Sequence, residues 1–173
     1  MISRRQATVA LSMALLGPVL AGCGFQPLYG SAAVTGGTGV GDQLAAIDIN
    51  EIPGRVGQVV RNELVFKTTG GGETPEALYK LDIALRESAQ STLVEIDGDA
   101  KGLVFALNAN FTLRRRSDNA VILSGKAQSR AAYQKVESIF ANIRARRDAE
   151  DRAAKMIADS IRTRVAAKLS ETA

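Results

Sequence analysis

The sequence predicts an α+β fold, a two-layer sandwich in which one mostly antiparallel sheet of about four strands is covered on one face by two helices. Apolar and polar residues alternate over residues 79–132, which is typical of half-buried strands. Apolar residues recur every three or four positions over residues 55–67 and 138–169, which is typical of amphipathic helices. The resulting order is strand, helix, three strands, helix, and it suits one sheet with its helices on a single face.

The first half of the domain contains one predicted strand and one predicted helix. The strand covers residues 44–51, because Ile47 and Ile49 alternate with polar residues, and Pro53-Gly54 ends it. The helix covers residues 55–67, where four apolar side chains fall on one face at helical spacing. These side chains are Val56, Val59, Val60 and Leu64.

The middle of the chain is predicted to be an antiparallel meander. Its first strand begins at Tyr79 and reverses at Asp97-Gly98, a dipeptide that is favoured in hairpin turns. The second strand is long and ends near Ser117-Asp118-Asn119, a run of turn-forming residues. The third strand covers residues 121–132. The last helix, over residues 138–169, carries a stripe of alanine and larger apolar residues that predicts close packing on the sheet.

The residue types exclude most catalytic and metal chemistry. The chain has no histidine, which removes the commonest general base and the commonest metal ligand. Its one cysteine is Cys23, so no disulfide stabilises the fold. Residues 97–102 begin like a calcium loop, but Lys101 repels a cation and Asn108 stands where a bidentate glutamate belongs. We therefore expect no metal, no cofactor apart from lipid on Cys23, and no enzymatic activity.

The first 22 residues have the layout of a bacterial secretory signal. Arg4 and Arg5 precede an apolar stretch over residues 7–20, which is too short to span a bilayer as a helix. Leu20-Ala21-Gly22-Cys23 then forms a lipobox, which predicts cleavage between Gly22 and Cys23 and acylation of the new first residue. Several acyl chains on one residue give stable anchoring. Gly24, in place of an aspartate, favours the outer membrane, with the protein facing the periplasm.

The predicted organisation is a signal at 1–22, an acylated terminus and flexible linker at 23–41, and a single α+β domain at 42–173. Glycine, serine and threonine dominate residues 31–41, as is typical of a tether. Cleavage would remove Arg4 and Arg5 from 22 basic residues that face 18 acidic ones, which lowers the net charge from +4 to +2. This modest charge and the predicted export argue against a nucleic-acid partner.

Two basic groups stand out in the domain. Arg114, Arg115 and Arg116 close the long strand beside a turn, and two interpretations remain open for them: a phosphate-binding cluster, or a charged edge that discourages aggregation. The second group lies on the last helix, where acidic residues are interleaved, so a solvated and salt-bridged face is favoured. Its members are Arg144, Arg146, Arg147, Arg152 and Lys155.

The string that follows the lipobox resembles a known family. Cys23-Gly24-Phe25-Gln26-Pro27-Leu28-Tyr29 is similar to the start of mature lipopolysaccharide-assembly lipoproteins, the LptE family, and its Pro-Leu-Tyr-Gly variant looks like the alphaproteobacterial type. The residues that carry the resemblance are Gly24, Phe25, Pro27, Leu28 and Tyr29, next to Cys23. The rest of the chain agrees only in length and in the order of its elements.

The resemblance implies a protein that plugs and helps to assemble the β-barrel lipopolysaccharide translocon and that assists insertion of lipopolysaccharide into the outer leaflet. Its implied partners are the barrel protein, lipopolysaccharide, and the inner leaflet of the outer membrane through the lipid anchor. Charge and hairpin geometry select candidate lipopolysaccharide contacts, namely Arg114, Arg115 and Arg116 with Lys126 and Arg130 on the neighbouring strand. Phe25, Pro27 and Leu28 either pack against the barrel or domain, or act as a stiff spacer.

Two other functions remain as alternatives. One is an auxiliary lipoprotein of an ABC-type lipid transport system, which would share the anchor, the size and the fold class. The other is a periplasmic hydrolase that uses carboxylates alone, although no pair of acidic residues points to one.

Replacing Cys23 with serine is expected to abolish acylation, because only the thiol can form the thioether to diacylglycerol. Mass spectrometry of the amino-terminal peptide and partition into detergent measure the effect. An unsubstituted chain whose mature terminus carries no fatty chains would contradict the prediction.

Overall fold

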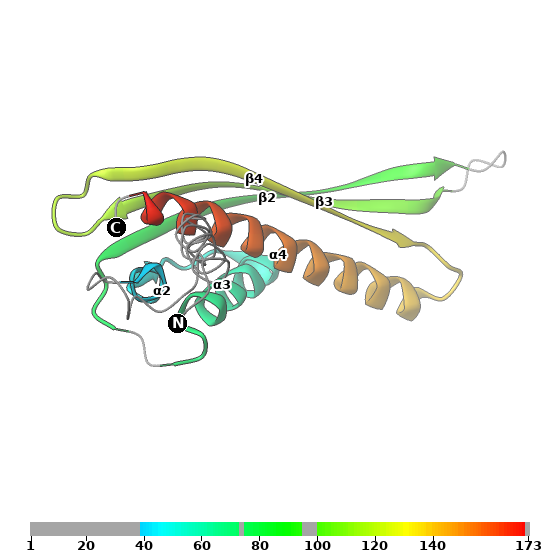
Figure 1. The fold of residues 1–173 in the computed structure, drawn as a ribbon. Coiled ribbons are helices and arrows are strands. Elements are labelled where there is room, and N and C mark those ends of the chain that lie inside the picture. The colour runs from blue at the N-terminus through cyan, green and yellow to red at the C-terminus, as the bar shows by residue number, and fades with distance from the viewer. Residues whose placement is uncertain (1–38, 73–74, 95–99, 172–173) are drawn as a thin grey trace, which may run out of the picture.

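The computed structural model describes residues 39–72, 75–94 and 100–171 (Figure 1). The predicted signal, the lipobox with Gly22 and Cys23, the opening string and the Asp97-Gly98 turn lie outside these residues. The described part of the chain forms one sheet and three helices.

The sheet has four strands in the order β1-β2-β3-β4: β1 (Ile47–Ile49), β2 (Tyr79–Val94), β3 (Ala100–Arg115) and β4 (Val121–Gln134). Strand β1 is parallel to β2, and the other neighbours are antiparallel. Leu81, Leu113 and Leu123 share one row across the sheet. The predicted meander of three long strands is therefore confirmed.

The helices are α2 (Val40–Ala45), α3 (Gly54–Thr69) and α4 (Ile139–Ser170). All three lie on one side of the sheet (Figure 1). Helix α4 is 32 residues long and begins after Ser138, whose side chain accepts a hydrogen bond from the Ala141 backbone N–H. The two-layer α+β sandwich predicted from the sequence is confirmed, with one short helix added to the expected two.

The predicted first strand at 44–51 is wrong at its beginning. Leu44 and Ala45 end helix α2, and the strand itself is only Ile47–Ile49. Two interactions hold this helix turn where a glycine-rich tether was expected. The Asp42 carboxylate accepts a hydrogen bond from the Gly39 backbone N–H at 3.3 Å, and the Leu44 side chain is buried in the core.

The core lies between α4 and the inner face of the sheet. Helix α4 contributes a stripe of small and medium side chains: Ala149, Ala153, Ala154, Ile157, Ala158, Ile161, Val165, Ala166 and Leu169. Strand residues of odd number, such as Phe105, Leu107 and Phe111, fill the opposite side. The buried Ser129 hydroxyl donates a hydrogen bond to the Ala153 carbonyl at 2.8 Å, so its polar group is satisfied.

Ion pairs join α3 to α4. Arg55 donates hydrogen bonds to the Asp151 carboxylate at 2.8 Å and to Glu150, and Lys67 contacts Asp159. The hydrogen bonds to Asp151 and then to Glu150 raise the pKa of Arg55, because they favour the charged guanidinium. The predicted salt-bridged face of α4 is confirmed for three of its members: Arg146 contacts Glu150, Arg152 contacts Asp148, and Lys155 lies 4.0 Å from Glu63.

The outer edge of β4 is covered by side chains of α4. Arg152 donates a hydrogen bond to the Ala132 carbonyl at 3.0 Å, and Arg164 donates one to the Lys126 carbonyl. Both carbonyls belong to the edge strand and have no neighbouring strand to bond. Two arginines of the helix layer therefore satisfy groups through which another strand would pair.

Replacing Gly57 with alanine is expected to lower the free energy of unfolding by about 2 kcal/mol. The new Cβ would lie 2.7 Å from the Ile52 carbonyl oxygen and 2.7 Å from Ile52 Cγ2, so the backbone of α3 must shift. Urea unfolding followed by circular dichroism measures the effect. The matched control is Gly41→Ala in α2, where nothing lies within 4 Å of the new Cβ. A Gly57→Ala protein as stable as this control would contradict the packing.

Candidate functional site

The face of the sheet opposite the helices is lined by polar residues. Even-numbered residues of β2 up to Gln90, of β3 from Val104 onward and of β4 point to this face, because odd-numbered residues of the same strands fill the core. We call it the open sheet face. One row across it joins Arg86, Asn108 and Gln128, and the next joins Ala84, Asn110 and Lys126. Each of these two rows thus combines amide side chains with a cation.

Five cations lie on the open sheet face: Lys80, Arg86, Arg114, Lys126 and Arg130. The carboxylates beside them are Asp82 on β2 and Asp48 on β1. Among these cations, an ion pair within the described chain is recorded for Arg114 alone, whose Nε lies 4.0 Å from Asp82. Exposed cations without a carboxylate partner attract anions over roughly 10 Å at moderate salt. The open sheet face is therefore net positive.

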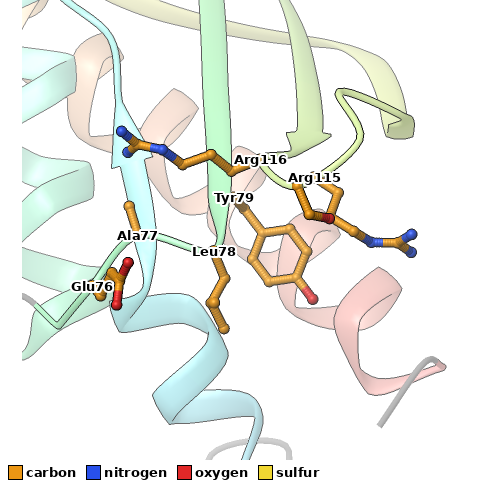
Figure 2. A pocket seen from close by; sticks show the side chains of 7 residues that line it. Glu76, Ala77, Leu78, Tyr79, Arg115 and Arg116 are labelled. Carbon is orange, nitrogen blue, oxygen red and sulfur yellow. The ribbon is translucent and has the colours of Figure 1, made fainter.

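The three consecutive arginines diverge, and each has its own carboxylate. Arg114 lies near Asp82, Arg115 contacts Asp118 at 3.1 Å, and Arg116 lies 4.0 Å from Asp48. Arg115 belongs to the inner, odd-numbered side of β3, and Arg116 comes just after the strand. Figure 2 shows the guanidinium groups of Arg115 and Arg116 pointing away from each other.

A shallow pocket of about 520 Å³ lies at this end of the sheet, beside the β3–β4 turn (Figure 2). Its lining combines Glu76, Ala77, Leu78, Tyr79, Arg115, Arg116 and Ser117. Backbone bonds hold it in place: the Leu78 N–H donates to the Ala46 carbonyl and the Arg116 N–H donates to the Leu78 carbonyl, both at 2.9 Å. The lining combines the exposed Leu78 with two arginines, and such a mixture of apolar and cationic residues suits an amphipathic anion better than a small polar metabolite.

The described residues contain neither a candidate metal site nor a candidate membrane-spanning helix. In the ranges 39–72, 75–94 and 100–171, no group of three His, Cys, Asp or Glu side chains is arranged to hold a metal ion. None of the described helices is long and apolar enough to cross a membrane. What these residues present is a polar surface of cations, amides and hydroxyls on one face of the sheet.

The structure brings some of the predicted contact residues together and separates others. Arg114, Lys126 and Arg130 share the open sheet face, whereas Arg115 and Arg116 line the pocket. Sequence reasoning missed Lys80 and Arg86, which the register places beside Arg114 and Asn108. The signal for both was present, because they occupy the polar positions of the alternating pattern in β2.

Comparison with known proteins supports the fold. No protein-family model and no curated protein sequence matches the chain. Among solved structures, the chain is similar to one from Caulobacter crescentus CB15, named as a candidate lipoprotein, with 24% identity and a TM-score of 0.63 over 78% of this chain and 97% of that one. It is also similar to rare lipoprotein B from Shewanella oneidensis, with 12% identity and a TM-score of 0.51 over 73% of this chain and 92% of that one. At these identities, the likeness concerns the fold.

Proposed function

We propose that the protein is an outer-membrane lipoprotein that plugs and helps to assemble a β-barrel lipopolysaccharide translocon, and that it binds lipopolysaccharide during insertion into the outer leaflet. The observation that carries the binding role is the open sheet face, with cations and amides on three adjacent strands. The lipobox at Cys23 and the string from Gly24 to Tyr29 support localisation to the outer membrane. The similarity in fold to a protein named rare lipoprotein B agrees with this proposal.

The chemistry of lipopolysaccharide suits this face. Lipid A and the inner core carry phosphates and carboxylates on a sugar backbone, and guanidinium and ammonium groups bind such anions with charge-assisted hydrogen bonds. Side chains such as Asn108, Asn110 and Gln128 offer donors and acceptors for sugar hydroxyls. The register of the three paired strands holds the backbone positions of these groups at fixed spacing.

The placement of a plug suits the same surface. The lumen of an outer-membrane barrel is polar, so a domain with mixed charges on its exterior fits there better than one with a broad apolar surface. The proposed role is non-catalytic, and it needs only binding and positioning.

Replacing both Lys126 and Arg130 with alanine is expected to weaken binding of purified lipopolysaccharide by about tenfold, because two unpaired cations are lost. The chain tested is the mature chain with Cys23→Ser, and fluorescence titration measures the dissociation constant. The Arg114→Ala, Arg115→Ala, Arg116→Ala variant loses less per charge removed, because each arginine already has a carboxylate nearby.

Lys155→Ala with Lys168→Ala controls for the loss of net charge in that titration; unlike Lys126 and Arg130, both lysines lie near a carboxylate. This double variant removes the same charge from the helix layer, where Lys168 contacts Glu171, and leaves the sheet untouched. Equal loss in the control and in the Lys126/Arg130 variant would show a diffuse charge effect and would remove the open sheet face as the binding surface.

Affinity capture of the acylated chain from detergent-solubilised outer membrane is expected to recover a β-barrel protein of the outer membrane. Mass spectrometry identifies the captured partner, and the Cys23→Ser chain is the control for dependence on the anchor. Recovery of an inner-membrane ABC transporter in place of a barrel would support the auxiliary lipoprotein of lipid transport and overturn the proposed partner.

A further inference from the structure

The start of α4 carries an exposed apolar cluster that neither the core nor the open sheet face uses. Ile139 is 78% exposed, Phe140 71%, Val136 50% and Ile143 48%. We call these four residues the α4 knob. They lie at the beginning of α4, at the opposite end of the molecule from the β3–β4 turn (Figure 1).

The α4 knob is held in a defined shape. The Asn142 side chain accepts a hydrogen bond from the Val136 backbone N–H and donates one to the Val136 carbonyl, both at 2.7 Å. Ser138 caps the first turn between them. These bonds hold Val136 against the helix, next to the apolar side chains of its first two turns. A frayed helix end would not carry such a clamp.

The first turns of α4 lie outside the core. The buried stripe of the helix begins only at Ala149, so residues 139–148 contribute no buried side chain to the core. Truncating the knob would therefore remove little from the stability of the domain, and its apolar residues are not explained by folding.

Cations surround the α4 knob. Lys135, Arg144 and Arg147 are exposed, and none of the three forms an ion pair with a carboxylate of the described residues. The Arg144 guanidinium lies over the Phe140 ring, 5.7 Å from its centre. Glu137 is the one acidic residue of the segment 135–147. The knob thus joins exposed aliphatic and aromatic side chains to a local excess of positive charge.

We propose that the α4 knob docks on an anionic phospholipid surface, with its apolar side chains among the acyl chains and its cations at the headgroup phosphates. Interfacial helices combine these same two features. A protein partner would have to present anions at positions that match these three cations. An anionic phospholipid surface has mobile headgroup phosphates, which can pair with cations at any spacing.

This inference rests on the proposed function only in needing a membrane within reach, and the barrel partner plays no part in it. Residues 23–38, fully extended, reach about 50 Å, and a 32-residue helix is about 48 Å long. An anchor at Cys23 is therefore compatible with contact at the far end of the domain.

Vesicle flotation of the mature chain with Cys23→Ser tests the inference, because no acyl group then contributes. Vesicles of phosphatidylethanolamine with one quarter phosphatidylglycerol are expected to bind the chain. Ile139→Ser with Phe140→Ser should reduce the bound fraction at least tenfold without adding charge. Arg144→Gln with Arg147→Gln should weaken binding by about tenfold on these vesicles and hardly at all on neutral phosphatidylcholine.

Phe66→Ser is the matched control, since Phe66 is an exposed aromatic residue on α3, 63% exposed and away from the knob. Circular dichroism confirms that each variant is folded. Vesicle binding that survives Ile139→Ser with Phe140→Ser, or that Phe66→Ser lowers equally, overturns the inference. Loss of a captured protein with vesicle binding unchanged would also overturn it and assign the knob to that protein. Vesicle binding by a chain that captures no barrel would leave this inference standing while the proposed function fails.

Discussion

The packing of α4 on the sheet is the constraint from which the rest of the structure follows. Small side chains such as Ala149, Ala153 and Ala158 allow the helix to lie close to the strands, and Phe105 and Phe111 fill the space opposite. Because side chains of a strand alternate between faces, burial of odd-numbered residues such as Leu81 and Leu107 sends the even-numbered residues between them to the open sheet face. The composition of that face is thus decided by a helix that never touches it. Gly125 belongs to the same constraint, because a Cβ there would lie 2.6 Å from the Phe111 ring.

Periodicity was sufficient to predict most of the fold. Alternation located the three long strands, and helical spacing located α3 and α4 to within a few residues. Helix α2 was missed because its residues follow a glycine-rich run, and what holds it is burial of Leu44 in a core made by distant segments. The parallel pairing of β1 with β2 joins Ile47 to Tyr79, and no local pattern encodes a contact over that separation.

The sequence alone predicted that the candidate site is positively charged, but not which carboxylates pair with its arginines or which other cations share its surface. The charge of residues 114–116 is obvious in the sequence, but their carboxylate partners include Asp48 and Asp82, which are far away along the chain. Only the register of the sheet brings those groups together, and only the register places Lys80 and Arg86 on the same surface. Electrostatic attraction at the β3–β4 turn is therefore weaker than a count of arginines suggests, and the unpaired cations farther along the sheet carry more of it.

The cover that Arg152 and Arg164 give to the edge of β4 has a consequence for how the protein behaves when crowded. Long strands with open edges tend to stack into fibrils when many copies share a small volume. At this edge, two carbonyls are already occupied by guanidinium groups whose helix is fixed in the core. Two copies of the protein that lie side by side at high density are therefore less able to pair through the edges of their β4 strands. Crowding on a membrane surface need not start fibril formation at this edge.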